Sequence, residues 1–232
     1  MKQNNLTKGL TIFFFIVSVL DIIGVSIGNL LLQAIFKPMI ILSLMVLYYY
    51  SLEKKNNWYL LALTFSFLGD VLLMDKNNLF LYGIAAFLMT QIIYIKLIVN
   101  QLIKSTLQQK ILAIIPFSMF IIVLLSILRD NLNEFLVPVI IYGITISIFG
   151  IVSFLNYMVK KNKTAQILLI GALLFIVSDS MIALNKFHEP KVIYPIAIMI
   201  TYVLAQYLIF IFISNEAERF RIKVDKKKFN NN

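Results

Sequence analysis

The sequence contains no cysteine and a single histidine, His188. Without thiols the chain can form neither a disulfide framework nor a thiolate metal site, and one histidine rules out a histidine-rich zinc centre. The eight glycines do not form a phosphate-binding glycine loop either. These absences exclude several common metal-dependent and nucleotide-binding chemistries, and we expect no metal and no other cofactor.

Charged residues are also scarce, at 14% of the chain, whereas hydrophobic residues make up 60%. Soluble domains have about 25% charged and about 45–50% apolar residues, so this excess predicts a polytopic membrane protein. A net charge of +10 raises the alternative of nucleic-acid binding. The basic residues, however, lie in short loops and in a C-terminal tail, where membrane proteins use them to fix orientation. We therefore expect no nucleic-acid partner.

Eight apolar segments are long enough to be membrane helices, which need about 20 residues to cross a bilayer. The fold class is predicted to be all-α, with residues 1–214 as one transmembrane domain and residues 215–232 as a basic cytoplasmic tail. The first segment resembles a signal peptide but lacks a clear cleavage site, so it is interpreted as a membrane helix. The predicted spans are residues 9–28, 35–51, 57–75, 79–99, 109–128, 134–157, 165–186 and 191–213.

Basic residues are distributed unequally between the two sides that eight spans define. Of the 21 Lys and Arg residues, 16 fall on the side that carries both termini. The positive-inside rule then predicts that both termini are cytoplasmic, in a multi-pass protein of a bacterial inner membrane. The five on the opposite side are Lys37, Lys76, Arg129, Lys186 and Lys191.

The two halves of the chain share a weak internal similarity. "ALTFSFLGD" in the third span resembles "ALLFIVSD" in the seventh, and "FLMTQIIY" in the fourth resembles "YVLAQYLI" in the eighth. Proline also stands near the start of the second and sixth spans, as Pro38 and Pro138. The pattern favours a parallel 4+4 repeat, although apolar sequence can produce such similarities by chance.

Three of the eleven acidic residues lie in the interior of predicted spans rather than at their ends, in loops or in the tail: Asp21, Asp70 and Asp179. An unpaired carboxylate inside a bilayer costs about 2.5–3.5 kcal/mol on insertion scales, so such a group faces a polar cavity, finds a partner or takes up a proton. At 1.5 Å per residue, Asp70 and Asp179 differ in depth by only about 3 Å, and Asp21 lies at a similar level. The alternative is a protonated carboxyl that only joins helices. A polar pocket in the outward half of the membrane is predicted.

Further polar residues accompany these acids. Gln91 and Gln206 lie near mid-span, Tyr202 is one helical turn from Gln206, and Lys37 opens the second helix on the outward side. Interhelical hydrogen bonding is an alternative explanation for each of them.

Five stretches of the chain together form a recognisable pattern: "FKPM" at the second span, "FSFLGDVLLM", "GIAAFLMTQIIYI", "IGALLFIVSDSMIALNKF" and "ITYVLAQYLI". With these stretches the sequence resembles the YhhN-like lysoplasmalogenase family over nearly its whole length. The resemblance implies an eight-span enzyme that cleaves the vinyl ether of lysoplasmalogens to a fatty aldehyde and glycerophosphoethanolamine or glycerophosphocholine. It implies the acidic positions Asp70 and Asp179. Recurrent polar positions map to Lys37, Asn185, Tyr202 and Gln206, and many relatives have histidine where this chain has Gln91.

Such a reaction suits a pair of carboxyls. Protonation of the vinyl ether at carbon gives an oxocarbenium ion, which water captures, and this calls for one protonated and one ionised carboxyl, as in glycoside hydrolysis. Asp179 is predicted as the acid and Asp70 as the base, with the reverse assignment open. Lys37 is a candidate phosphate ligand and Asp21 an additional pocket acid. Two rival functions are a proton-coupled transporter and a hydrolase of another lipid.

Overall fold

The computed structural model describes residues 5–75, 78–102 and 104–229. All secondary-structure elements within these residues are α-helices or 3-10 helices, which confirms the all-α prediction. The long helices are α1 (Asn5–Ser26), α2 (Leu30–Ser51), α3 (Asn57–Leu72), α4 (Phe80–Val99), α5 (Leu107–Leu128), α6 (Leu136–Lys160), α7 (Lys163–Phe187) and α8 (Ile193–Phe229). Two 3-10 turns, η1 (Arg129–Asn131) and η2 (Asn133–Phe135), join α5 to α6.

Seven of these helices are long and apolar enough to cross a membrane, and α3 is a shorter apolar helix of 16 residues. The chain is therefore an integral multi-pass membrane protein. Several helix ends differ from the predicted ones, and two of these differences matter most. α2 begins at Leu30, so Lys37 lies two turns inside the helix rather than at its start, and α8 continues as a helix to Phe229 through residues predicted as a tail.

Polar caps and a left-handed glycine determine where several helices begin and end. The Asn29 Oδ1 accepts hydrogen bonds from the backbone N–H groups of Leu31 and Leu32 and so starts α2 directly after Gly28, whose φ is +67°. Thr106 and Gln109 form a reciprocal capping box at the start of α5. These signals explain why the membrane helices are joined by short turns.

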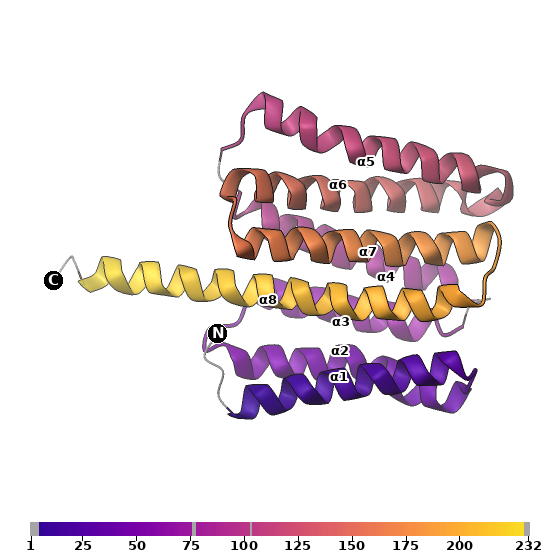
Figure 1. Ribbon diagram of the computed structural model, residues 1–232, viewed down its shortest axis with the longest axis horizontal. Helices are drawn as coiled ribbons and strands as arrows, with labels where there is room; N and C mark the ends of the chain where they lie inside the picture. The colour runs from indigo at the N-terminus through magenta and orange to yellow at the C-terminus, as the bar shows by residue number, and fades with distance from the viewer. Residues whose placement is uncertain (1–4, 76–77, 103, 230–232) are drawn as a thin grey trace.

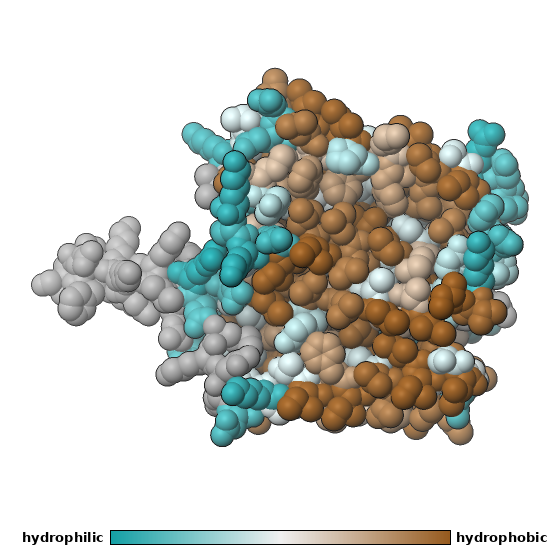
Figure 2. All heavy atoms as spheres, in the orientation of Figure 1, coloured by the Kyte–Doolittle hydropathy of each residue, from teal (hydrophilic) through white to brown (hydrophobic). Residues whose placement is uncertain are grey.

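The helices run nearly parallel to one another (Figure 1). α5, α6, α7 and α8 follow one another across the front of the view, α3 and α4 lie behind them, and α1 and α2 form the opposite edge. The start of α1 and the end of α8 lie at the same end of the bundle, called here the termini end, and the α1–α2 turn lies at the far end. An apolar belt separates two polar ends (Figure 2), as expected for a protein in a bilayer.

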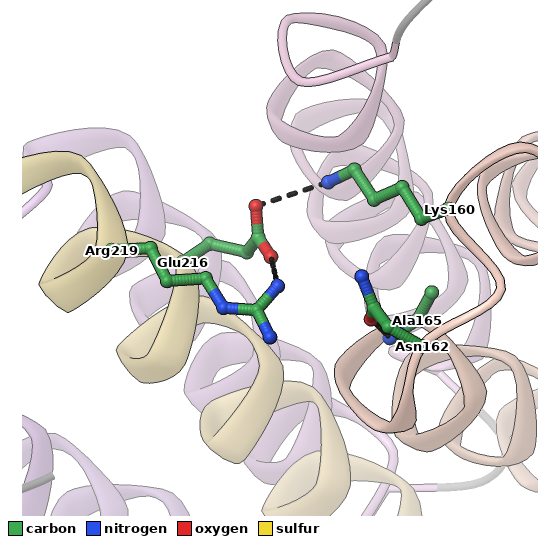
Figure 3. Close-up of polar contacts among 5 residues, drawn as sticks. All are labelled: Lys160, Asn162, Ala165, Glu216 and Arg219. Carbon is green, nitrogen blue, oxygen red and sulfur yellow. Dashed lines mark hydrogen bonds and ion pairs between the residues drawn. The ribbon is translucent and has the colours of Figure 1, made fainter. Parts of the chain in front are cut away.

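A partly buried ion pair joins α6 to α8 at the termini end (Figure 3). The Lys160 ammonium donates to a Glu216 carboxylate oxygen at 3.0 Å, and the two side chains are only 10% and 15% exposed. The Arg219 guanidinium holds the other oxygen of Glu216 at 3.2 Å. Beside them, the Asn162 side chain caps α7 by accepting from the backbone N–H of Ala165. Charged groups thus fix α8 where it leaves the apolar belt.

Several helix contacts among the first four helices have a counterpart among the last four. Consecutive helices pair as α1 with α2, α3 with α4, α5 with α6 and α7 with α8. Between pairs, α2 packs on α3 as α6 packs on α7, and α4 packs on α6 as α8 packs on α2. These pairings are compatible with a 4+4 repeat, whereas the contacts of α1 with α8 and of α5 with α7 are not among the pairings that the two halves share.

Candidate functional site

Two polar clusters lie inside the apolar core, one around each of the predicted acids. Asp70 is in the last turn of α3, and its side chain is 3% exposed. The Tyr202 hydroxyl, from α8, donates to Asp70 Oδ2 at 2.7 Å. The Gln206 Nε2, one turn along α8, donates to Tyr202 at 3.4 Å and to Ser66 Oγ of α3 at 3.0 Å. The Tyr202 phenol of α8 therefore holds the Asp70 carboxyl, and the Gln206 amide holds the Tyr202 phenol.

The network around Asp70 extends to α4. The Tyr94 hydroxyl donates to Gln206 Oε1 at 2.8 Å, and the Ser66 hydroxyl donates to Thr90 Oγ1 at 3.2 Å. Both atoms of the Gln206 amide are thus bonded within a fully buried site. Satisfied buried networks of this kind hold side chains in one geometry.

The second cluster surrounds Asp179 of α7, whose side chain is 7% exposed. The Gln91 Nε2, from α4, donates to Asp179 Oδ2 at 2.8 Å and to the Tyr142 hydroxyl at 2.8 Å. The Tyr142 hydroxyl, from α6, donates to the same Asp179 oxygen in a short hydrogen bond. A phenol again donates to a buried carboxyl, as at Asp70, but here the glutamine amide also donates directly to the carboxyl.

Two further predicted residues, Asp21 and Lys37, interact electrostatically with Asp70. Asp21 of α1 is fully buried, and neither of its carboxyl oxygens has a hydrogen-bond partner among the described residues. The half-buried Lys37 of α2 is within electrostatic reach of both Asp21 and Asp70. Asp70 is in turn within electrostatic reach of Asp179. The structure therefore brings Asp21, Lys37, Asp70 and Asp179 into one electrostatic group.

Asn185 is the exception among the predicted site residues. It lies on α7, six residues after Asp179, and is half-buried. Within the part of the chain that the structure describes, its side chain makes no hydrogen bond to either cluster. Six residues on a helix turn a side chain by about 240° relative to Asp179, which explains the separation.

An apolar pocket opens beside Asp179, between α4, α5, α6 and α7. Its empty volume is about 510 Å³, part of which is open to the surroundings. Asp179, Tyr142 and Ser180 are its only hydrogen-bonding side chains, and Gly143 is among the small residues that leave it space. The Asp179 side chain is therefore part of the wall of an apolar pocket.

Tyr142, Tyr94 and Thr90 are network residues that the sequence did not single out. The chain has 11 tyrosines, and their apolar rings fit a core or an interfacial belt equally well. Tyr142 could have been noticed as a hydroxyl about six residues inside an apolar span, at a depth similar to that of Asp179. Which tyrosines reach the acids depends on helix packing, and packing is not visible in one sequence.

Two other chemistries find no support in the site. A Gly-x-Ser-x-Gly sequence does occur at residues 24–28, but Ser26 is exposed at the end of α1, whereas a nucleophile elbow joins a strand to a helix. Over residues 5–75, 78–102 and 104–219, no three His, Asp or Glu side chains are grouped to hold a metal ion.

A multi-pass helical bundle with two hydrogen-bonded carboxyls in its core belongs to the class of membrane proteins that carry an intramembrane acidic site. Within this class the chain belongs to the YhhN family, whose model matches residues 32–212. That match contains Lys37 and both acid clusters but begins after Asp21. No curated protein and no solved structure matches the chain.

Proposed function

We propose that the protein is a membrane-embedded hydrolase that cleaves the vinyl ether bond of lysoplasmalogens. The observation that carries the proposal is the pair of buried carboxyls, each accepting a hydrogen bond from a tyrosine that a glutamine amide also contacts, with an apolar pocket opening beside one of them. Membership of the YhhN family is consistent with this activity. The products would be a fatty aldehyde and glycerophosphoethanolamine or glycerophosphocholine.

The reaction needs no group beyond the two carboxyls and water. The Asp179 carboxyl transfers its proton to the vinyl carbon distal to oxygen, which leaves an oxocarbenium ion. Water adds to the cationic carbon and gives a proton to the Asp70 carboxylate. Asp70 then protonates the ether oxygen as the hemiacetal collapses, and the hemiacetal hydroxyl returns a proton to Asp179. One water is consumed, and both carboxyls regain their starting states.

The different neighbours of the two acids support this assignment of roles. Asp70 lies within electrostatic reach of the Lys37 ammonium, a setting that suits a carboxylate and the stabilisation of a passing cation. Asp179 is hydrogen-bonded by the neutral groups Tyr142 and Gln91 and faces an apolar pocket, a setting that suits an uncharged carboxyl. The proposal therefore keeps Asp179 as the acid and Asp70 as the base.

Gln91 replaces the histidine of many relatives without removing a hydrogen-bond donor from the site. Its Nε2 donates to Asp179 and to Tyr142, whereas an amide cannot exchange protons near neutral pH. The proton cycle proposed here runs through the two carboxyls alone, with Gln91 as a positioning residue. In this proposal Lys37 binds the substrate phosphate, and Asp21 balances the charge of Lys37 when the site is empty; the electrostatic influence of Lys37 on both Asp21 and Asp70 supports these roles.

We further propose that all eight long helices span a bacterial inner membrane with both termini in the cytoplasm. α3 is about 24 Å long at 1.5 Å per residue, close to the 30 Å of the hydrocarbon core, so slight local thinning accommodates it. Two of the basic residues that set the orientation, Lys2 and Lys76, lie outside the described residues. The proposed domains are residues 1–214 in the membrane and the basic tail 215–232 in the cytoplasm, and a 4+4 repeat is consistent with the helix pairing.

One observation favours a second candidate, a proton-coupled transporter. Asp21, Asp70 and Asp179 form a row of buried carboxyls from α1 to α7, and such rows also relay protons in carriers. A transporter must open at both ends, so substrate-dependent uptake into liposomes distinguishes it from an enzyme. Hydrolysis of another lipid remains a third candidate, distinguished by the products formed.

The test is aldehyde release by purified protein from lysoplasmenylethanolamine in detergent. We expect Asp70→Asn and Asp179→Asn each to lower the rate by about 10²–10⁴-fold, the range for losing a general acid or base. Asp130→Asn is the matched control, because this exposed acid at the far end should leave the rate unchanged. Aldehyde release that persists in both site variants, or that is absent from the unaltered protein, would contradict the proposal.

A further inference from the structure

The pocket beside Asp179 has walls that fit a hydrocarbon chain. Eleven of its 14 lining residues carry no hydrogen-bonding side chain, and the three that do sit on the α6 and α7 walls. The apolar walls come from all four surrounding helices, with Ile84 on α4, Leu124 on α5, Val139 on α6 and Ile182 on α7 as examples. A ligand that enters this space can form hydrogen bonds only at the end near Asp179 and Tyr142.

The side of the pocket formed by α5 faces the apolar belt of the molecule. α5 is the outermost helix of the front layer (Figure 1), and only Ala113, Phe117 and Leu128 of its 22 residues are buried. Leu124 and Leu125, which line the pocket, are half-buried. The neighbouring Ile122 and Val123 are 68% and 48% exposed, on the surface that a bilayer would cover. One helix therefore separates the pocket from surrounding lipid.

Aromatic rings close the pocket toward the far end of the bundle. Phe80 and Phe187 both line it, and their ring centroids lie 5.7 Å apart. Phe135 of η2 packs on both rings, at 5.9 Å from Phe80 and 5.4 Å from Phe187. Three apolar rings therefore pack together at that end, which favours entry of an apolar ligand from the side, past α5, over entry from the aqueous phase.

The geometry points to this pocket as the binding site for the single hydrocarbon chain of a lysolipid, with the chain beside α5 and its first carbons at Asp179. The inference rests on the proposed function, because it gives the alkenyl chain of the substrate its position. Lys37, which acts electrostatically on Asp70, would then bind the phosphate. The substrate is stretched across the core, with its vinyl ether between the two acids. The size of the pocket sets which chain lengths are accepted.

Photo-crosslinking to a lipid that the enzyme cannot cleave tests the position of the chain. The probe is a saturated 1-O-alkyl lysophosphoethanolamine with a diazirine near the end of its chain, added to the full-length protein in detergent micelles. We expect labelled peptides from α5, α6 and α7 around Leu124, Val139 and Ile182. Excess unlabelled probe should abolish labelling, whereas a diacyl phospholipid should not. Labelling confined to other helices, or equal competition by the diacyl lipid, overturns the inference.

Filling the pocket tests its role in selecting chain length. Ala183→Phe places a ring in the space, and we expect the ratio of rates on long-chain to short-chain lysoplasmalogens to fall about tenfold or more. Val177→Phe is the matched control on the same helix, because Val177 is 47% exposed outside the pocket. An unchanged ratio in Ala183→Phe would refute the inference.

A second variant guards against misfolding of the first. At Gly143 an added Cβ would lie 2.2 Å from Ile121 Cδ1, so Gly143→Ala pushes a flexible side chain into the pocket with a smaller disturbance. We expect the same change in the ratio, to a smaller extent. The crosslinking probe separates the two proposals, because pocket labelling without aldehyde release would refute only the hydrolase. Aldehyde release with labelling elsewhere would refute only the chain site.

Discussion

At the scale of single residues, the Gln91 amide donates hydrogen bonds to both the Asp179 carboxyl and the Tyr142 hydroxyl, so its replacement should affect both. Gln91→Leu removes both donated hydrogen bonds and leaves a buried carboxyl held by Tyr142 alone. Leaving a buried polar group without its hydrogen bond costs about 1–3 kcal/mol, so we expect aldehyde release to fall about 5-fold to 150-fold. Gln91→His keeps one donor and should restore most of the rate. Equal losses in the two variants would show that Gln91 acts through volume alone.

The residues of the candidate site were predicted to different extents, for physical reasons. Asp70 and Asp179 could be predicted because a carboxyl in an apolar span is costly and therefore noticeable. The hydroxyls of Tyr142 and Tyr94 were missed, because a tyrosine costs little in a core and its partner is on another helix. Lys37 was expected at a helix start, yet it lies two turns inside α2, because Asn29 caps the helix earlier. Asn185 was predicted for the site, but its side chain makes no hydrogen bond to either cluster.

At the scale of elements, the Lys160–Glu216 pair gives a stability prediction for the contact of α6 with α8. Glu216→Gln leaves the Lys160 ammonium, which is 10% exposed, without its charged partner. The cost should be about 1–3 kcal/mol, and each kcal/mol lowers the midpoint of thermal unfolding by about 2–4 °C in a chain of this size. The measurement is thermal unfolding of the protein in detergent.

The control for this pair replaces both charges. Lys160→Met combined with Glu216→Leu should recover most of the midpoint, because an apolar pair can replace a buried ion pair at little cost. Arg219 also loses its carboxylate partner in that variant, but its side chain is 48% exposed and stays hydrated. A double variant no more stable than Glu216→Gln would mean that Lys160 is held by other contacts, such as the Phe212 ring.

The elements themselves were largely predictable, and their ends were less so. Each predicted apolar span corresponds to one helix, because hydrophobic length determines where a chain can lie in a bilayer. The third predicted span ended at residue 75, whereas α3 ends at Leu72, where a turn begins. α8 runs on to Phe229 as one helix, because continuing a helix satisfies its backbone groups whether or not the side chains are apolar. Apolar length therefore identifies a membrane helix better than it identifies the ends.

At the scale of the whole molecule, each half of the chain donates hydrogen bonds to the buried acid of the other half. Gln91 of the first half holds Asp179 of the second, and Tyr202 and Gln206 of the second half hold Asp70 and Ser66 of the first. Gln91 and Gln206 are the residues that the internal similarity aligns. A site assembled from both halves in this way lies at the interface between them, where membrane proteins built from repeats place their ligands.

The proposed orientation can be tested directly, because a chain without cysteine makes each introduced cysteine the only labelling site. With both termini cytoplasmic, a membrane-impermeant maleimide should label Asp130→Cys and Glu189→Cys in cells whose outer membrane alone is permeable. Lys54→Cys and Lys104→Cys should react only after the inner membrane is opened. Lys54→Cys and Asn78→Cys flank α3 and test whether this short helix crosses the membrane. If it does, the two cysteines must be labelled from opposite sides. Labelling of both from one side would leave seven spans, and the two acids could then no longer lie at one depth.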